Sequence, residues 1–269
     1  MGQARSRVRV LALNNNSSSS SQQDSSMEVL AGSGLQGFAD GAGAAAQFSG
    51  PQGVAVDGEG NIIVAEFGNH RVRKITPDGT VSTLAGSGSA GFADGAGAAA
   101  QFNCPIGVAV DGEGSIIIAD QWNNRVRKIT PDGTVSTLAG SGSQGFADGA
   151  GAAAQVNYSF GVAVDGEGSI IVTDIHNKRV LKITPDGTVS TCFAGCGIRG
   201  VAIDADGCVV VATEDDTVAK IAGCGLVSAC AAAQKRSLAF CMLSHERLGH
   251  DSIWAGLEQG LLQMVLGKH

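Results

Sequence analysis

Long apolar runs are absent from this chain. No stretch approaches the 18 consecutive apolar residues that would cross a membrane as a helix, and no apolar signal-peptide segment follows Met1. The sequence therefore predicts neither a membrane span nor secretion, and we expect a cytoplasmic protein.

Basic charge is also scarce, because 18 Lys and Arg residues stand against 25 Asp and Glu residues, and the net charge is −7. A nucleic-acid-binding protein usually carries a basic footprint, so this balance disfavours RNA as a partner. The basic residues recur at a regular spacing, and we expect them on a solvated strand face. They are Arg71, Arg73, Lys74, Arg125, Arg127, Lys128, Arg179 and Lys182.

Residue groups with catalytic or metal-ligand spacing are missing as well. The 7 cysteines include no Cys-x-x-Cys pair, the 5 histidines do not cluster, and no Ser-His-Asp or Cys-His arrangement stands out. Zinc sites and catalytic sites need such groups, so we expect no metal, no cofactor and no enzymatic activity.

Aromatic residues make up only 4% of the chain, whereas glycine occurs 40 times. The apolar content of 43% consists mostly of Val, Ile, Leu and Ala. This composition favours many short strands joined by tight turns over a helical core.

A 54-residue unit occurs three times and then a fourth time in shortened form. Residues Asp57–Gly86 return as Asp111–Gly140 with only 6 of the 30 positions changed. A third copy starts at Asp165, and a truncated copy starts at Asp204. A fixed period of this length indicates stacked supersecondary units, and a residue copied in each unit usually packs in the same way each time.

Each unit is predicted to form four antiparallel strands, which are typical of a β-propeller blade. Asp-Gly and Pro-Asp-Gly between the strands are hairpin signals, because glycine accepts a positive φ without a steric cost. The alternation of the third strand breaks at Lys74, which predicts a local bulge. In the first unit the expected strands are Gly53–Val56, Asn61–Glu66, Arg71–Thr76 and Thr80–Ala85.

The segment GVAVDGEGNIIVAEFGNHRVRKI, which starts at Gly53, resembles the NHL repeat. The signature Asn-His pair stands at Asn69 and His70, and His70 is replaced by Asn124 and then Lys178 in the next units. Members of the NHL family are typically six-bladed propellers that serve as binding platforms, and the resemblance implies that architecture and that role. This chain supplies only about four blades.

We therefore expect an all-β fold, with the propeller in residues 27–230. Met27–Gly32 matches the fourth strand of a unit, and propellers commonly close by pairing such a strand with the last blade. Residues Gly225–Cys230 are the alternative fourth strand of that blade, and the sequence does not choose between them. A second copy of the chain that completes the ring is a further alternative.

The two ends of the chain lack the repeat. Residues 1–26 are polar and of low complexity, which predicts a disordered tail. Gly2 and Ser6 fit the N-myristoylation pattern, and neighbouring arginines would supply a second membrane signal, so a lipid tether at Gly2 is an alternative to a freely diffusing protein. Residues 231–269 are predicted to form a short helical tail.

The loops between the second and third strands change from unit to unit, whereas the tight turns barely change. Alternating hairpins place these loops at the same end as the longer Phe-Ala-Asp-Gly loops. Variable loops on a rigid scaffold often carry recognition, and aromatic residues are typical of interface hot spots. The candidate partner-binding residues are Phe67, His70, Trp122, Asn124, His176 and Lys178.

The repeated Phe-Ala-Asp-Gly loops contribute one carboxylate each, from Asp40, Asp94 and Asp148. Calcium needs about six to eight oxygen ligands, so one carboxylate per loop is too few. We expect these side chains to cap backbone amides instead.

These observations favour an interaction scaffold that binds a protein or peptide through the face that carries the variable loops. One alternative is a metal-dependent propeller lyase or hydrolase. Another is single-stranded RNA binding with aromatic stacking. The arginines for the RNA alternative are Arg71, Arg73, Arg125 and Arg127.

Overall fold

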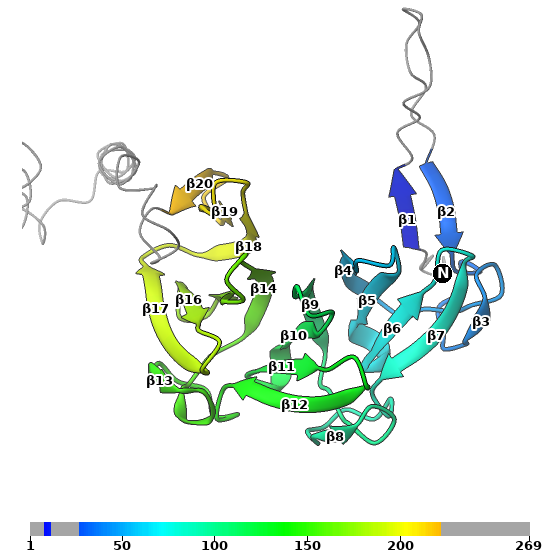
Figure 1. The fold of residues 1–269 in the computed structure, drawn as a ribbon, viewed down its shortest axis with the longest axis horizontal. Helices are drawn as coiled ribbons and strands as arrows, with labels where there is room; N and C mark the ends of the chain where they lie inside the picture. The colour runs from blue at the N-terminus through cyan, green and yellow to red at the C-terminus, as the bar shows by residue number, and fades with distance from the viewer. Residues whose placement is uncertain (1–7, 12–26, 222–269) are drawn as a thin grey trace, which may run out of the picture.

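The computed structural model describes residues 8–11 and 27–221. Within these ranges the chain forms twenty β-strands and three short 3-10 turns, which is the predicted all-β fold (Figure 1). The predicted helical tail at 231–269, the alternative strand Gly225–Cys230 and the acylation site Gly2 lie outside the described residues.

Four antiparallel blades follow the sequence repeat. Blade 1 contains β4 (Pro51–Val56), β5 (Ile62–Glu66), β6 (Arg71–Ile75) and β7 (Thr80–Ala85). Blade 2 contains β9 (Pro105–Val110), β10 (Ile116–Asp120), β11 (Arg125–Ile129) and β12 (Thr134–Ala139). Blade 3 contains β14 (Ser159–Val164), β15 (Ile170–Asp174), β16 (Arg179–Ile183) and β17 (Thr188–Ala194). Blade 4 contains β18 (Ile198–Ile203), β19 (Val209–Thr213) and β20 (Val218–Ile221) in the described part of the chain.

A fifth strand of two residues lies at the outer edge of each of the first three blades. These strands are β3 (Gly41–Ala42), β8 (Gly95–Ala96) and β13 (Gly149–Ala150), and they pair with β7, β12 and β17. Two-residue strands have no alternation to detect, so the sequence predicted four strands per blade. The 3-10 turns are η1 (Phe67–Asn69), η2 (Gln121–Asn123) and η3 (Gly151–Ala153).

The blades succeed one another around an arc, with β4, β9, β14 and β18 on its inner side (Figure 1). Successive inner strands contact each other, and the arc is open between blade 4 and strands β1 and β2 (Figure 1). The described residues thus form a four-bladed propeller arrangement, as the repeat predicted.

The hydrophobic core lies between blades. We call the side of a blade that points to the following blade its trailing face, and the opposite side its leading face. Ile63, Ala65 and Val72 on the trailing face of blade 1 pack with Val108 and Ile116 on the leading face of blade 2, and all five are buried. Equivalent clusters join blade 2 to blade 3 and blade 3 to blade 4.

Two glycines of the inner strands allow the blades to approach closely. A Cβ atom at Gly53 would lie 2.1 Å from the carbonyl oxygen of Ile106 in blade 2. A Cβ atom at Gly107 would lie 2.0 Å from the carbonyl oxygen of Phe160 in blade 3. Any side chain at these positions would therefore push neighbouring blades apart.

A bulge is present where the third and fourth strands of blade 1 pair, but its extra residue lies on the fourth strand and not at Lys74 of the third. The pairing of β6 with β7 shifts between Val72 and Arg73, which face Ala85 and Thr83. Leu84 of β7 is the extra residue of this β-bulge.

Strand β1 (Val8–Leu11) pairs antiparallel with β2 (Met27–Ala31). Within the segment predicted to be disordered, these four residues instead form a strand, because β2 offers them a hydrogen-bonding edge. Strand β2 therefore pairs with β1, and in the described part of the chain it does not pair with blade 4.

Candidate functional site

A fully buried arginine links two carboxylates in each of the first three blades. In blade 2, Nη1 of Arg127 donates to Oδ2 of Asp120 at 2.9 Å, and Nη2 donates to Oδ1 of Asp94 at 2.6 Å. Arg127 and Asp120 are both 0% exposed, whereas the side chain of Asp94 is 43% exposed. Arg73 makes the same two contacts in blade 1, with Glu66 and Asp40.

Blade 3 builds the same charge cluster from a different strand position. Leu181 stands where the first two units have Arg73 and Arg127. The buried guanidinium comes from Arg179 instead, whose Nε lies 2.7 Å from Asp174 and whose Nη1 lies 2.9 Å from Asp148. Positions i and i+2 of a strand point to the same face, so an arginine at either position can reach the carboxylates.

The expected solvated strand face is therefore wrong for Arg73, Arg127 and Arg179, which are fully buried, and for Lys182, which is 9% exposed. Each guanidinium has one partner carboxylate 5 or 7 residues away in the sequence and a second one 31 or 33 residues away. Together the two carboxylates make burial of the guanidinium tolerable.

Burial dominates the electrostatics of the inner carboxylates. It raises the pKa of Asp120 to about 6, although hydrogen bonds from Asn123, from the Asn103 amide and from Arg127 oppose the shift. Burial raises the pKa of Glu66 as well, against the hydrogen bonds of Arg73. Perturbed carboxyl groups can mark active sites, but these recur from blade to blade and are fully covered, so we assign them to packing.

Asp40 and Asp148 cap backbone amides, as predicted, whereas Asp94 accepts hydrogen bonds from the hydroxyl of Thr137, and all three carboxylates also bind the buried arginines. The amide of Thr83 donates to Oδ2 of Asp40 at 3.1 Å, and the amide of Thr191 donates to Oδ2 of Asp148 at 2.7 Å. Each Phe-Ala-Asp-Gly loop is therefore fastened to the outer strand of its blade.

The two kinds of loop lie at the same end of the molecule, as the hairpin order predicted. The side-chain amide of Asn69, between β5 and β6, donates to the carbonyl oxygen of Gly37 at 2.8 Å. The equivalent bonds run from Asn123 to Gly91 and from Asn177 to Gly145. We call this end the loop-bearing end.

Two of the predicted partner-binding residues meet across the boundary between blades 1 and 2. Trp122 is 55% exposed, and its ring lies edge-on to that of Phe67, with ring centroids 6.3 Å apart. His176 is exposed in blade 3, where it stacks on Tyr158 with centroids 4.3 Å apart. Lys178 is exposed beside it.

The other two predicted residues point toward the next blade. Nδ1 of His70 accepts a hydrogen bond from the amide of Cys104 at 3.1 Å, and Oδ1 of Asn124 accepts one from the amide of Tyr158 at 3.1 Å. Burial, together with the positive charge of Arg71, lowers the pKa of His70, which favours the neutral ring that this bond requires. These side chains tie successive blades together.

Three exposed phenylalanines at the loop-bearing end were missed as candidates from the sequence. Phe38, Phe92 and Phe146 are 44%, 43% and 58% exposed. Each ring lies against an arginine, with the guanidinium carbon 3.8 Å from the ring centroid for Arg71 and Phe38. The repeated Phe-Ala-Asp-Gly sequence was the signal, because three copies keep a large apolar residue on an exposed loop.

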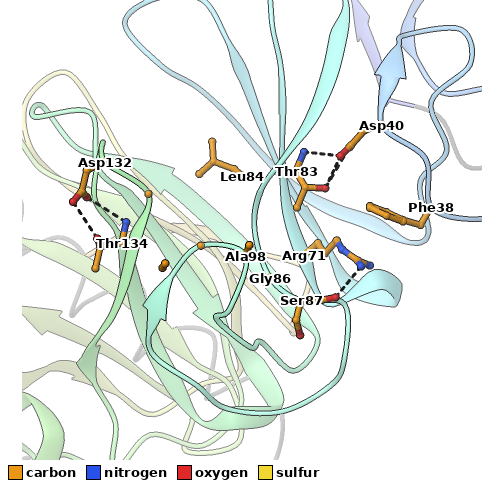
Figure 2. Close-up of a pocket in the computed structure, with 13 residues that line it drawn as sticks. Phe38, Asp40, Arg71, Thr83, Leu84, Gly86, Ser87, Ala98, Asp132 and Thr134 are labelled. Carbon is orange, nitrogen blue, oxygen red and sulfur yellow. Dashed lines mark hydrogen bonds between the residues drawn. The ribbon is translucent and has the colours of Figure 1, made fainter.

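A groove of about 530 Å³ lies between the outer parts of blades 1 and 2 (Figure 2). Phe38, Asp40 and Arg71 line it on the side of blade 1, and Asp132 lines it on the side of blade 2. Figure 2 shows Asp40 bonded to Thr83 and Arg71 bonded to Ser87, so the polar atoms along this groove are held in place.

Metal-ligand geometry is not found among the residues that the structure describes, where no three His, Cys, Asp or Glu side chains gather as a possible site. The described chain also contains no helix whose length and apolar character would allow it to cross a membrane.

The blades and their 54-residue period define a β-propeller built from sequence repeats. A family model described as the NHL repeat matches residues 48–75 and 102–129, so the chain carries NHL repeats in these two segments, as the sequence resemblance indicated.

Curated relatives match a short part of their own length. The chain is 38% identical over 91 residues to Protein SUPPRESSOR OF QUENCHING 1, chloroplastic, of Arabidopsis thaliana, a match that covers 34% of this chain and 9% of that protein. It is 35% identical over 97 residues to NHL repeat-containing protein 2 of Bos taurus, which covers 35% of this chain and 13% of that protein.

Solved structures share the fold at low sequence identity. A gluconolactonase from Xanthomonas campestris has a TM-score of 0.50 at 18% identity, over 65% of this chain and 58% of that chain. An auxiliary nutrient binding protein from Bacteroides ovatus has a TM-score of 0.51 at 15% identity, over 65% of this chain and 49% of that chain.

Proposed function

We propose that this NHL-repeat propeller is an interaction scaffold whose loop-bearing end binds a protein or a peptide. The observation that carries the proposal is the pair formed by Trp122 and Phe67. A tryptophan that is 55% exposed leaves a large apolar surface in water, and Phe67 holds one edge of its ring. Tryptophan is among the commonest hot-spot residues of protein interfaces.

The surroundings of this pair support an elongated partner with apolar and basic side chains. Phe38, Phe92 and Phe146 lie at the same end, one in each of three successive blades. A half-exposed carboxylate of Asp40, Asp94 or Asp148 lies two residues further along each loop. The same chemistry is therefore presented once per blade, and the net charge of −7 also favours a basic partner.

A peptide library tests the proposal without a known partner. Random dodecapeptides displayed on phage would be selected on the immobilised full chain, and the enriched peptides would be titrated by fluorescence anisotropy. Trp122→Ala should weaken their binding by on the order of 2 kcal/mol, about thirtyfold. The same change should alter the free energy of unfolding by no more than about 0.5 kcal/mol, since the ring lies at the surface.

The matched control is Val126→Ala, four residues further along the chain. Val126 is fully buried between blades, so its truncation should destabilise the fold by about 1 kcal/mol or more. The enriched peptides should still bind the folded fraction of this variant. Peptides that bind wild type and Trp122→Ala equally well would place recognition elsewhere on the molecule.

The RNA alternative loses two of its four arginines in the structure. Arg73 and Arg127 are fully buried and paired with carboxylates, so they cannot reach a phosphate backbone. The alternative of a metal-dependent lyase or hydrolase has no ligand cluster in its favour among the described residues. The likeness to a gluconolactonase, at 18% identity, concerns the fold.

A further inference from the structure

Strands β1 and β2 have the geometry of half a blade. Val8, Arg9, Val10 and Leu11 face Ala31, Val29, Glu28 and Met27. In blade 1, Val72, Arg73, Lys74 and Ile75 face Ala85, Thr83, Ser82 and Val81. The register shift falls between the first two pairs in both cases. The β1–β2 pair therefore occupies the third and fourth strand positions of a blade in front of blade 1, and the two inner positions of that blade are empty in the described structure.

The inner part of the leading face of blade 1 is exposed as a result. Val54 is 59% exposed, whereas the equivalent Val108 and Val162 are each 8% exposed because a preceding blade covers them. Val56, two residues further along β4, is 66% exposed. The outer part of the same face is covered, since Ile75 and its neighbours are buried with Ala31 of β2.

Within residues 8–11 and 27–221, the trailing face of blade 4 is the matching open surface. The pairing of β18, β19 and β20 places Val210, Ala212 and Val218 at the positions that Ile63, Ala65 and Val72 hold in blade 1. In blade 1 these three residues are buried against blade 2. In blade 4, Ala212 is exposed and Val218 is 75% exposed.

Gly200 independently indicates that the trailing face of blade 4 can accept a following blade. Gly53, Gly107 and Gly161 each stand where a Cβ atom would meet a carbonyl oxygen of the next blade, at 2.1, 2.0 and 2.8 Å. Gly200 holds the equivalent position in blade 4, but there a Cβ atom would meet only Ala212 of its own blade, at 3.4 Å. Blade 4 thus has the small residue that close approach of a following blade requires.

We propose that the trailing face of blade 4 docks on the leading face of blade 1 of a second copy of this chain, head to tail. The contact would continue the interface that the molecule already forms between its own successive blades. Strands β18 and β19 of one copy then fill the two inner positions beside the β1–β2 pair of the other. Strand β20 takes the third position in place of β1, which can yield because a two-stranded pair is only marginally stable in water.

The choice of a second copy follows from the shape of the two surfaces. Wherever one blade covers the trailing face of another in this molecule, it does so with its leading face, which carries the repeat pattern. The part of the chain that the structure describes offers one open leading face, on blade 1, whereas the sequence of residues 222–269 lacks the repeat pattern. A head-to-tail contact joins two different surfaces and is therefore heterologous. Each surface can then be altered separately, and the two altered chains can be mixed.

The test measures the mass of the full chain in solution by sedimentation equilibrium. Wild type should exceed the monomer mass of 27.0 kDa. Val54→Asp on the leading face and Val218→Asp on the trailing face should each weaken association by on the order of a hundredfold, because each places a carboxylate in an apolar contact. Both valines are exposed in the single chain, so the variants should fold, and circular dichroism would check this. Leu35→Asp, at a residue 51% exposed in a loop, is the control that should behave as wild type.

An equimolar mixture of the two variants gives the decisive result. Each mixed pair keeps one unaltered leading face and one unaltered trailing face, so the mixture should recover complexes of two chains. Wild type that remains at 27.0 kDa up to roughly 100 μM would overturn the proposal. A mixture that stays monomeric would overturn it too, since an isologous contact would then explain the loss in the single variants. If wild type is monomeric and β20 is protected from hydrogen exchange, residues 222–269 cover the trailing face instead.

Discussion

At the scale of single residues, the buried arginines are positions at which we expect substitution to destabilise the fold strongly. Arg127 and Asp120 are both 0% exposed, and the guanidinium also reaches the carbonyl oxygens of Gln101 and Ala93. A buried ion pair of this kind contributes little net free energy by itself, but removing one partner leaves an uncompensated charge in the core.

We therefore predict that Arg127→Met lowers the free energy of unfolding by about 3–5 kcal/mol, because Asp120 is left buried without its counter-ion. Chemical denaturation would measure the loss. The control is Arg199→Ala, at a side chain 61% exposed and paired with Glu214, which should cost no more than about 1 kcal/mol. Similar losses in the two variants would contradict the assignment of Arg127 to the core.

The raised pKa of Asp120 predicts how stability depends on pH. The pKa rises from 3.8 to about 6 in the folded chain, so between these values the folded state binds more protons than the unfolded state. The contribution of this group to stability is then fully present below pH 3.8 and is lost as pH rises through about 6. The stability advantage of wild type over Asp120→Asn should shrink across this window in denaturation curves. An advantage that grows with pH would show that Arg127 lowers the pKa of Asp120 instead.

At the scale of strands, the third blade shows that the charge cluster belongs to a place in the fold and not to a sequence position. Arg179 aligns with Arg125 in the repeat, yet the two residues do different things. Arg125 is half-buried and donates to the carbonyl oxygens of Asn123 and Ser141, while Arg179 binds the buried Asp174.

Equivalent substitutions at these aligned positions should therefore differ. Arg179→Ala should cost about 3–5 kcal/mol of unfolding free energy, because Asp174 loses its counter-ion. Arg125→Ala should cost about 1–2 kcal/mol, through the loss of its stacking on Phe92 and of its two hydrogen bonds. Thermal and denaturant unfolding of the two variants, measured side by side, would check this. Equal losses of unfolding free energy would show that the aligned sequence position alone determines the effect.

At the scale of the whole molecule, the arc has two inner blades and two end blades. Blades 2 and 3 are covered on both faces by neighbouring blades, whereas no other described residues cover the trailing face of blade 4. Repeat proteins gain much of their stability from contacts between neighbouring units, so an end unit opens more easily.

Native-state hydrogen exchange should reveal this gradient in the monomer at low micromolar concentration. Amides of β10 and β15 should exchange close to the rate of global unfolding, and amides of β19 should exchange faster through local opening. Uniform protection across β10, β15 and β19 would contradict the prediction and indicate that another segment or another chain covers blade 4.

The strands of the blades follow from local sequence. Asp-Gly and Pro-Asp-Gly turns, and runs such as Ile62–Glu66, specify hairpins through residues that are neighbours in the chain, and the 54-residue period then repeats them. Hairpin order likewise determines that the loops of Asn69 and Gly37 share one end. The exposure of Trp122 follows for the same reason, since a position that holds Gly68 in one unit and His176 in another cannot belong to the core.

Tertiary structure decided what depends on the neighbouring blade. The residue type at the position of His70 and Asn124 changes from unit to unit, as is typical of a recognition loop. Their side chains nevertheless accept hydrogen bonds from amides of the next blade, 34 residues away. Arg73 belongs to an alternating run of basic and apolar residues, which is typical of a solvated strand face. In the structure it is buried and forms ion pairs with Glu66 and Asp40. Strand β1 contains Val8, Val10 and Leu11 ahead of the polar run that begins at Asn14, and its partner strand β2 is 16 or more residues further along the chain. Local pattern reports which way a side chain points from its own strand, whereas burial and pairing depend on what the fold brings opposite it.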